Sequence, residues 1–269
     1  TQADLESAPA INRDIKDIVR ADPRIYVDDS RDAIHCGGAN PRFNSLTLDG
    51  VRMNDNFGLN SNGYPTVRQP FSFDALEQVA VEMAPFDVQY GSFTSCNINA
   101  VTKSGTNELH GGVFFDYTND SMKGDSIDEI DGDIDNGNYT EKRYGFNVGM
   151  PLIEDKLFLF TSYEKLEGVK QFDYGPVDNG NISQSDIDRI RQITSDVYNY
   201  DIGGTPGSMP IEDEKLLVKL DWNINEDHRA SVVYNYNDGF DLSQSDADND
   251  ELAFSSHFYE RGAEFYSIV

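Results

Sequence analysis

The chain has 269 residues, of which 48 are acidic and 21 are basic, so its formal net charge is −27. A protein that binds nucleic acid needs a basic surface to displace counterions from phosphate, and this charge excludes such partners. No apolar run reaches the roughly 18 residues of a transmembrane helix. A membrane barrel stays open as a fold class, because its strands need only about ten residues of weak alternation.

The N-terminal part of the chain mixes short helical, extended and loop segments. The predicted elements are, in chain order, a helix at 12–21, a strand at 45–51, a loop at 54–69, a short helix at 73–78 capped by Ser72, and a strand at 79–83. Ile15, Ile18 and Val19 share the apolar face of the first helix, and Asp22-Pro23 ends it. This mixture predicts a compact α/β unit at residues 1–107.

Residues 108–269 show a different pattern, in which apolar and polar residues alternate along successive segments. In residues 143–150, Tyr, Phe, Val and Met share one face, while Arg, Gly and Asn share the other. A period of two places each set on one face of a sheet. The alternation predicts antiparallel strands at 109–117, 143–150, 156–165, 214–224, 229–237 and within 252–269.

Two architectures use such strands with opposite orientations. A soluble sandwich points its apolar faces inward, whereas a membrane barrel points them to lipid around a polar lumen. Small polar residues on the second face, and connections that alternate between short and long, favour the barrel. The long connections, expected outside the cell, are 119–141, 168–212 and 238–251. Aromatic residues near strand ends, typical of an interfacial girdle, are Tyr117, Tyr144, Trp222, Tyr234 and Tyr236.

Three motifs stand close together around the boundary between the two parts. They are NSLTLDGVRMND at 44–55, EMAPFDVQYG at 82–91 and NINAVTKSGTNELHGG at 97–112. Together they resemble the plug-domain signatures of TonB-dependent outer-membrane transporters, and most closely those of the Oar-like branch. The chain departs from the family pattern at Ala84, where the family has Gly before Pro, and at Ser95-Cys96, where it has two glycines.

The resemblance implies a mixed α/β plug domain at 1–107, followed at 108–269 by the first strands of a membrane β-barrel. It also implies energy-coupled import across the bacterial outer membrane, with the plug facing the periplasm and the long loops outside the cell. The implied partners are a TonB-type inner-membrane complex, outer-membrane lipid or lipopolysaccharide, and a peptide, protein or lipoprotein ligand. The family carries an energy-coupling box near its mature N-terminus, and no match to it is present here.

The number of predicted strands has a geometric consequence. About six strands cannot enclose a plug, because the diameter of a barrel grows with its strand number and plugged transporters have about 22 strands. An open sheet edge is not viable in lipid, so the chain is expected to be part of a larger polypeptide. The segment 156–165 is apolar on both faces at its start, and its inner side is expected to pack against the plug.

The loop at 54–69 is the candidate substrate site, since the matching loop of the family lies at the outer apex of the plug. Aromatic, amide and guanidinium groups suit a polar or peptide ligand, and the candidate residues are Phe57, Asn60, Tyr64 and Arg68. The alternative is an Ω-type loop that satisfies its own backbone.

Alternating carboxylates in two long loops are a candidate Ca²⁺ site, because such oxygens can surround a hard cation. The candidate ligands are Asp131, Asp133, Asp135, Asp246, Asp248 and Asp250. An EF-hand is excluded, since Gly137 comes one place late and Lys142 stands where a bidentate Glu belongs. The alternative is a solvated acidic run, and no other cofactor is expected.

A helix is predicted in the loop at 168–212, where Ser185 and Asp188 resemble a capping box. Its apolar stripe is expected to pack on the barrel wall or, alternatively, to form a lid that binds a partner. The stripe consists of Ile187, Ile190, Ile193 and Val197.

Cys36 and Cys96 are the two cysteines of the chain. If the protein is exported, as the resemblance implies, they can form a disulfide. Two buried thiols, or a zinc site with His35 that lacks a fourth ligand, are the alternatives. The four histidines show no metal spacing and no nucleophile elbow or phosphate loop is present, so the chain is not expected to be an enzyme. The alternative function is a secreted or surface-attached, calcium-dependent adhesion module rich in β-strands.

Overall fold

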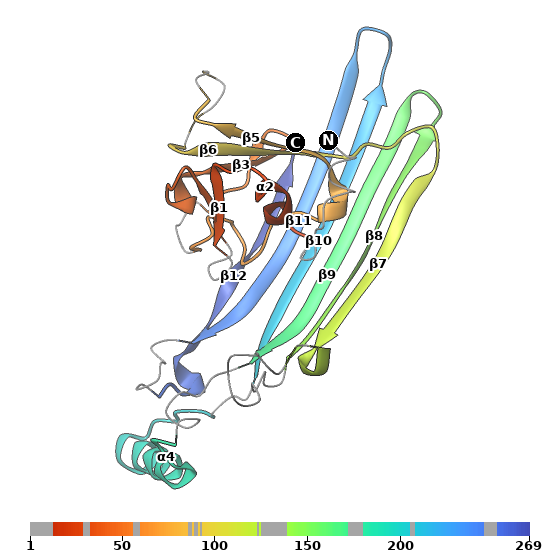
Figure 1. Ribbon diagram of the computed structural model, residues 1–269. Helices are drawn as coiled ribbons and strands as arrows, with labels where there is room; N and C mark the ends of the chain where they lie inside the picture. Colours follow the sequence, from red (N-terminus) through yellow and green to blue (C-terminus); the bar gives the residue numbers. More distant parts are fainter. Residues whose placement is uncertain are drawn as a thin grey trace.

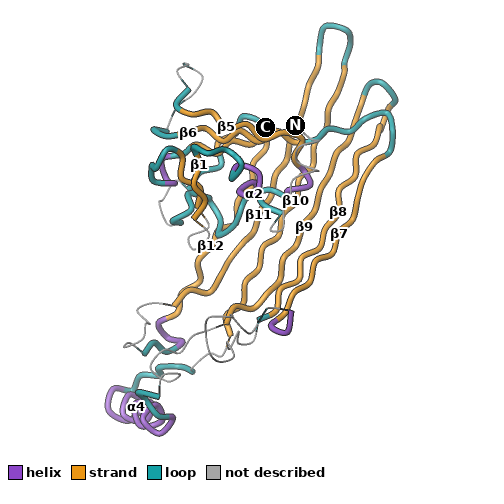
Figure 2. Tube along the Cα trace, in the orientation of Figure 1, coloured by secondary structure: helices purple, strands orange, loops and turns teal. Residues whose placement is uncertain are grey.

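The computed structural model consists of a small mixed domain, here called the plug, and a tall sheet, here called the wall (Figure 1). The described residues are 13–28, 33–55, 60–85, 88, 91, 93–122, 124, 139–171, 180–204, 208–244 and 252–269. Figure 2 shows the plug on one face of the wall and a helix beyond the far ends of the strands. Among the described residues, no helix combines the length and the apolar character needed to cross a bilayer.

The plug contains two separate sheets and short helical turns. Its elements are α2 (Ile15–Val19), β1 (Ile25–Asp28), β2 (Ala33–Cys36), η1 (Pro41–Phe43), β3 (Ser45–Leu48), β4 (Val51–Arg52), η2 (Phe73–Ala75), β5 (Leu76–Met83) and β6 (Cys96–Thr102). β1 and β2 form an antiparallel hairpin, and the other strands form a sheet in the order β4-β3-β6-β5. β6 is therefore a central strand, parallel to β3 and antiparallel to β5.

The first predicted helix is confirmed as α2, although it is shorter than predicted. The side chain of Asp14 caps it by accepting a hydrogen bond from the N–H of Lys16 at 2.9 Å. Ile15 and Val19 are buried, which confirms the apolar face read from their spacing.

Two other predicted elements of the plug are wrong in detail. The predicted strand at 45–51 is interrupted at Asp49 and Gly50, whose φ angles of 48° and 84° form a tight turn between β3 and β4. The predicted helix at 73–78 is only the 3-10 turn η2, because Leu76 already has extended backbone and begins β5. Ser72 makes no side-chain cap there.

The wall is an antiparallel sheet in which each strand pairs with the next along the chain. Its strands are β7 (His110–Asn119), β8 (Thr140–Ile153), β9 (Leu157–Gln171), β10 (Ser208–Asn223), β11 (Arg229–Gln244) and β12 (Phe258–Ile268). This confirms the predicted strands and their order. β8 to β11 run three to seven residues further toward the long connections than predicted, because pairing continues through charged positions such as Glu167 opposite Lys142.

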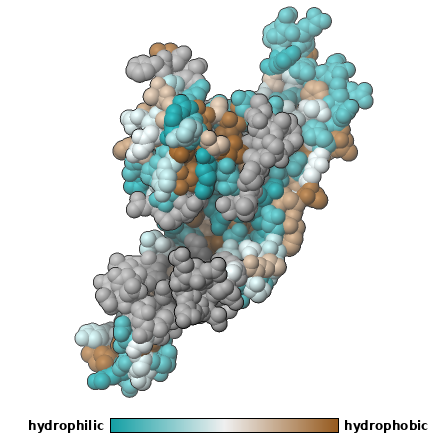
Figure 3. Space-filling model, in the orientation of Figure 1, coloured by the Kyte–Doolittle hydropathy of each residue, from teal (hydrophilic) through white to brown (hydrophobic). Residues whose placement is uncertain are grey.

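The two faces of the wall have opposite chemistry. On the face toward the plug, Asn235 and Asn237 are at most 1% exposed. On the other face, Val113, Phe115 and Trp222 are at least 50% exposed. Figure 3 shows apolar residues along the edge of the wall and hydrophilic residues at the tips of the short hairpins. A soluble sandwich would bury the apolar set, so the predicted outward-facing apolar surface is confirmed.

The hydrophobic core lies within the plug and reaches the wall. Ile15, Leu48 and Ile98 belong to it on the plug side, and Phe160 and Leu217 join it from the wall. Phe160 lies in the first half of β9, which confirms the expected packing of that strand against the plug.

The helix of the second long connection is α4 (Gln184–Tyr198), which Figure 1 places beyond the ends of the strands. Its capping box uses Ser183 and Asp186, so the predicted pair Ser185 and Asp188 is wrong by two residues. In its apolar stripe Ile187 is buried, whereas Ile193 and Val197 are exposed, so much of the expected packing on the wall is not formed.

Candidate ligand site and the seam between plug and wall

The segment after β4 is braced by its own side chains. The N–H of Asn60 donates to Oδ2 of Asp55 at 2.7 Å, and the side-chain amide of Asn60 donates to the Tyr64 carbonyl at 3.0 Å. Asn62 accepts a hydrogen bond from the Tyr64 N–H and donates one to the Val67 carbonyl, both at 2.9 Å. These contacts are typical of a loop that satisfies its own backbone polar groups.

The predicted ligand residues differ in their accessibility. Phe57 lies outside the described residues. Asn60 and Tyr64 are buried inside the loop, and burial raises the pKa of the Tyr64 hydroxyl well above its ordinary value. The side chain of Arg68 is 33% exposed and reaches toward the wall. Ligand contact by these four residues stays a prediction, and Arg68 is the described member that a ligand can reach in this state.

Arg68 meets charged wall residues at the beginning of β8. Its Nη2 lies 3.3 Å from Oε2 of Glu141, and Oε1 of Glu141 lies 3.3 Å from Nη2 of Arg143. The Tyr139 hydroxyl donates to Oε2 of Glu141 at 3.4 Å. A cationic group of a ligand can replace one of the two guanidinium groups that share this carboxylate. The displaced arginine is then free to bind an anionic group of the same ligand.

Glu141 was not among the predicted site residues, because it was counted with the acidic loop at 119–141. Arg143 was placed on the polar face of its strand without a role. Glu141 lies two residues before Arg143 in β8, so both face the plug. Extending the alternation by two residues would have found this pair.

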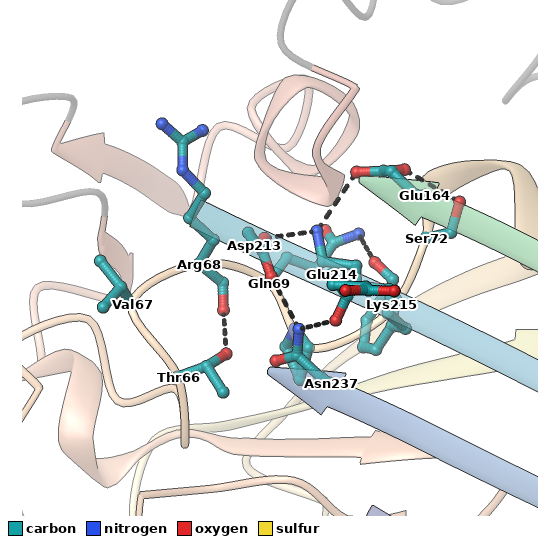
Figure 4. A network of polar contacts seen from close by, with 12 residues as sticks. Thr66, Val67, Arg68, Gln69, Ser72, Glu164, Asp213, Glu214, Lys215 and Asn237 are labelled. Atoms are coloured by element: carbon teal, nitrogen blue, oxygen red, sulfur yellow. Dashed lines mark hydrogen bonds and ion pairs between the residues drawn. The ribbon is translucent and has the colours of Figure 1, made fainter. Parts of the chain in front are cut away.

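A second polar cluster surrounds Lys215 of β10 (Figure 4). Nζ of Lys215 lies 2.9 Å from Oδ2 of Asp213 and 3.2 Å from Oε1 of Glu164. The Ser72 hydroxyl of the plug donates to Oε2 of Glu164 at 2.9 Å. The side-chain amide of Asn237 donates to Oδ1 of Asp213 at 2.7 Å. All five residues are buried, so the cluster links the plug to three wall strands away from bulk water.

The cluster contains one cation, Lys215, and two carboxylates, and the guanidinium of Arg143 supplies further positive charge near Glu164. Desolvation of buried ions offsets much of their Coulomb attraction, so such pairs add little net stability compared with apolar residues of similar volume. Removing one member leaves a buried charge without its partner, which costs about 3–5 kcal/mol. Glu164 is the member of the three that contacts the plug, through Ser72, and Lys215 and Asp213 hold the Glu164 carboxylate in place.

A third group of contacts fixes the end of β6. Nζ of Lys219 donates to the carbonyl and the hydroxyl oxygen of Thr102 at 3.2 and 3.3 Å. Thr102 in turn donates from its N–H and its hydroxyl to the carboxylate of Asp49, at 3.0 and 2.5 Å. Asn235 adds a bond from β11 to the Pro70 carbonyl at 3.3 Å. The central strand of the plug is thus anchored where the chain leaves for the wall.

The beginning of the described chain is held by side chains of the plug and the wall. The Arg13 guanidinium pairs with Asp74 and lies 3.7 Å from the ring centroid of Phe114 in β7. Burial raises the pKa of Asp74, and the charge of Arg13 opposes that rise. The N–H of Ile15 donates to Oε1 of Gln69 at 2.8 Å, which connects α2 to the residue after Arg68.

Cys36 and Cys96 form a disulfide, which confirms the predicted bridge and excludes the two alternatives for these cysteines. Their Cα atoms lie 6.0 Å apart, and the bridge joins the last residue of β2 to the first residue of β6. The Ser95 hydroxyl supports it by donating to the Cys36 carbonyl at 2.9 Å. The hairpin β1–β2 is thereby covalently attached to the central strand of the other sheet.

The predicted Ca²⁺ ligands lie outside the described residues. They are Asp131, Asp133, Asp135, Asp246, Asp248 and Asp250. Within the part of the chain that the structure describes, no group of three or more potential metal ligands is present. Calcium binding by the long loops stays a prediction.

A sheet that is apolar outside and polar inside, with a domain seated on its inner face, defines an outer-membrane β-barrel with an internal plug. The family described as TonB-dependent Receptor Plug Domain matches residues 1–95, and the family described as Outer membrane beta barrel domain matches residues 101–206. The chain belongs to the TonB-dependent receptors of the bacterial outer membrane and carries their plug and first barrel strands.

Two curated relatives carry the same assignment. The TonB-dependent transporter Oar of Myxococcus xanthus is 26% identical over 209 residues, which cover 75% of this chain and 19% of Oar. A probable TonB-dependent siderophore receptor, PirA of Acinetobacter baumannii, is 30% identical over 193 residues, which cover 62% of this chain and 22% of PirA. The chain therefore spans about a fifth of the length of these relatives, and neither of them is an enzyme.

Solved structures show the same fold. The outer-membrane transporter YddB of Escherichia coli matches with a TM-score of 0.66 at 15% identity, over 91% of this chain and 33% of YddB. The siderophore receptor PirA of Acinetobacter baumannii matches with a TM-score of 0.58 at 20% identity, over 92% of this chain and 32% of PirA. The alternative of an adhesion module is not favoured by these relatives or by the outward-facing apolar surface.

Proposed function

We propose that the complete protein imports a substrate across the outer membrane, with a TonB-type inner-membrane complex supplying the energy that moves the plug. The observation that supports this most directly is the polar seam, the set of buried polar contacts between plug and wall. In it, the wall residues Glu164 and Lys219 bind Ser72 and Thr102 of the plug. Water can replace such bonds as the plug moves, whereas separating an apolar interface would expose its surface.

The outer end of the seam is the proposed substrate site. Arg68 and Glu141 lie side by side there, with Arg143 on the other oxygen of the same carboxylate. A ligand carrying both an anionic and a cationic group can replace this pair with two new ones, one to Arg68 and one to Glu141. A peptide has these groups at its termini, and a peptide or protein is the proposed substrate class. The relative PirA, a probable siderophore receptor, supports a siderophore as the competing class.

Binding at this site can couple to the plug only through a difference in affinity between its closed and opened states. Gln69 follows Arg68 directly and accepts the hydrogen bond from the N–H of Ile15. Displacing Arg68 from Glu141 would shift Gln69 and weaken the hold on α2. Substrate at the outer side would thereby favour release of the N-terminal segment.

The experiment compares cells that express the complete protein with cells that lack it. Cells are incubated with an unlabelled tryptic peptide mixture, and depletion of each peptide from the medium is followed by mass spectrometry. Depletion that requires both the receptor and an energised TonB-type complex is the expected result. Depletion that is equal without the receptor overturns import of peptides, and receptor-dependent uptake of a ferric siderophore alone overturns the substrate class.

Matched arginines test the site. Arg68→Gln is expected to reduce peptide uptake strongly, because the anionic end of the peptide loses its partner. Arg24→Gln is the control, since Arg24 lies exposed on the plug and pairs with Asp22 at 2.6 Å. Equal uptake by both variants would remove Arg68 from the site.

Further partners are proposed for the outer face of the wall, for α4 and for the long loops. The outward-facing apolar residues would contact outer-membrane lipid, with lipopolysaccharide around the charged positions near the strand ends. The exposed stripe at Ile193 and Val197 of α4 offers a surface to a lipoprotein lid or to a protein ligand. The long loops remain the proposed place for Ca²⁺.

A further inference from the structure

We propose that the Cys36–Cys96 disulfide determines which part of the plug can be drawn out of the lumen, so that only the segment before Cys36 unravels under tension. This rests on the proposed function, in which the coupling complex pulls on the chain before Arg13. The bridge spans a sequence separation of 60 residues and joins the end of β2 to the beginning of β6. Tension that reaches Cys36 therefore passes to Cys96 without entering the residues between them.

The load path can be followed along the structure (Figure 1). It runs from α2 through β1 and β2 to the disulfide, and from Cys96 along β6 to Thr102. There Lys219 of β10 holds the strand, and the chain continues into the wall. Tension does not enter the residues that lie between the bridged cysteines in sequence. These residues comprise β3, β4, β5 and the segment 53–72 with Arg68, here called the apical segment.

The segment in front of the bridge is arranged to open stepwise. In the hairpin, Ile25 pairs with Cys36, and Asp28 pairs with Ala33 near the connection. Tension enters at Ile25 and leaves at Cys36, which are the two partners at the open end. The cross-strand pairs therefore break one after another, each under a small load, until the hairpin is extended.

The segment behind the bridge would resist in a different way. β3 is parallel to β6, with Ser45 opposite Asn97 and Leu48 opposite Ala100. Without the disulfide, tension would enter β3 at Ser45 and leave β6 at Thr102, which loads all the cross-strand pairs at once. The bridge removes this load, so the four-stranded sheet and the apical segment stay seated on the wall. The opening is then a partial one, located where α2, β1 and β2 had been.

Single-molecule pulling on the complete protein in lipid measures this limit directly. The probe is attached before Arg13, and the wild-type protein is pulled with and without a thiol reductant. Reduction is expected to add about 200 Å of extension, which is the contour length of the 60-residue separation at about 3.3–3.6 Å per residue. Equal extension in both conditions, or departure of the plug as one folded unit, would overturn the proposal.

The consequence in cells has its own readout. The pair of substitutions Cys36→Ala and Cys96→Ala is expected to make energised cells sensitive to a bulky glycopeptide antibiotic, because the whole plug can then leave the lumen. Ser95→Ala is the control, since it removes the hydrogen bond to the Cys36 carbonyl and keeps the bridge. Sensitivity that is unchanged in the double variant, while it still imports the substrate of the wild type, overturns the proposal. Loss of import by the wild type itself overturns the proposed function instead.

Discussion

The plug and the wall use the same alternation of side chains with opposite results. In β6 of the plug, Ile98 and Ala100 are buried in the hydrophobic core. In β11 of the wall, the buried face carries Asn235 and Asn237, whereas Val232 on the other face is 50% exposed. Alternation fixes which residues share a face, but only the surroundings decide which face is covered by protein.

This difference determines how the two regions can meet. Because the apolar side chains of the wall face lipid, mainly polar side chains face the plug. The plug forms hydrogen bonds with them through the Ser72 hydroxyl, the Pro70 carbonyl and the end of β6 at Thr102. A small apolar contact at Phe160, Leu217 and Val233 completes the seam. The plug is thus held by contacts that water can replace.

The largest effect is expected when a buried charge of the seam is removed. Lys215→Ala leaves Asp213 and Glu164 without their cation, and the expected loss is about 3–5 kcal/mol in the free energy of unfolding. Lys142→Ala is the matched control on the outer face, where Lys142 is exposed and its pair with Glu167 at 2.7 Å is screened by solvent, so a much smaller loss is expected. Urea titration of the complete protein in detergent micelles measures both values.

A compensated variant sharpens this comparison. Combining Lys215→Met with Asp213→Asn and Glu164→Gln removes all three charges, and most of the lost stability is expected to return. Equal destabilisation by Lys215→Ala and Lys142→Ala would show that losing a charged partner costs no more in the buried seam than on the outer face.

The next effect concerns the direction of the apolar face. Val232→Arg places a charge on the lipid side of β11, and the expected cost is about 2–4 kcal/mol if the residue lies near the bilayer midplane. Val88→Arg makes the same change on the plug at a fully exposed position, where about 0.5 kcal/mol or less is expected. The measurement is the folding equilibrium of the complete protein in lipid vesicles. Equal costs at the two valines would contradict the assignment of the outer face.

Much of this architecture could be predicted from the sequence, because it depends on local patterns. The period of two located the wall strands, and the spacing of Ile15 and Val19 located α2. The plug motifs imply that the protein is exported, and the disulfide between Cys36 and Cys96 follows from the oxidising compartment that export implies. The strands and the helix were predicted from residues that are close in sequence, and the disulfide from the compartment in which the whole chain is expected to lie.

The remainder depends on partners that are far apart in sequence. Ser72 was predicted to cap a helix, but its hydroxyl binds Glu164, 92 residues away. The sequence places Glu141 in a loop, and only its pairing with Thr118 and Gly168 shows that β8 continues to that residue. The turn at Asp49 and Gly50 was taken as part of a strand, although this dipeptide favours the positive φ angles of a hairpin. This turn, unlike the other two features, depends on local sequence and not on distant partners.

The smallest effect is expected at α4, which packs less extensively than either region and depends on its own cap. Ser183 and Asp186 exchange hydrogen bonds at the first turn, and these bonds lower the pKa of the Asp186 carboxyl. A lowered pKa means that the contribution is complete above the ordinary pKa of about 3.8 and is lost as the pH falls through the lower folded value. Ser183→Ala is expected to cost about 1 kcal/mol of helix stability at neutral pH, and Ser195→Ala in the same helix is the control. Hydrogen exchange of the first-turn amides of α4, corrected for intrinsic rates, measures the loss. Unchanged protection in Ser183→Ala would show that the helix is held by packing at Ile187 and not by its cap.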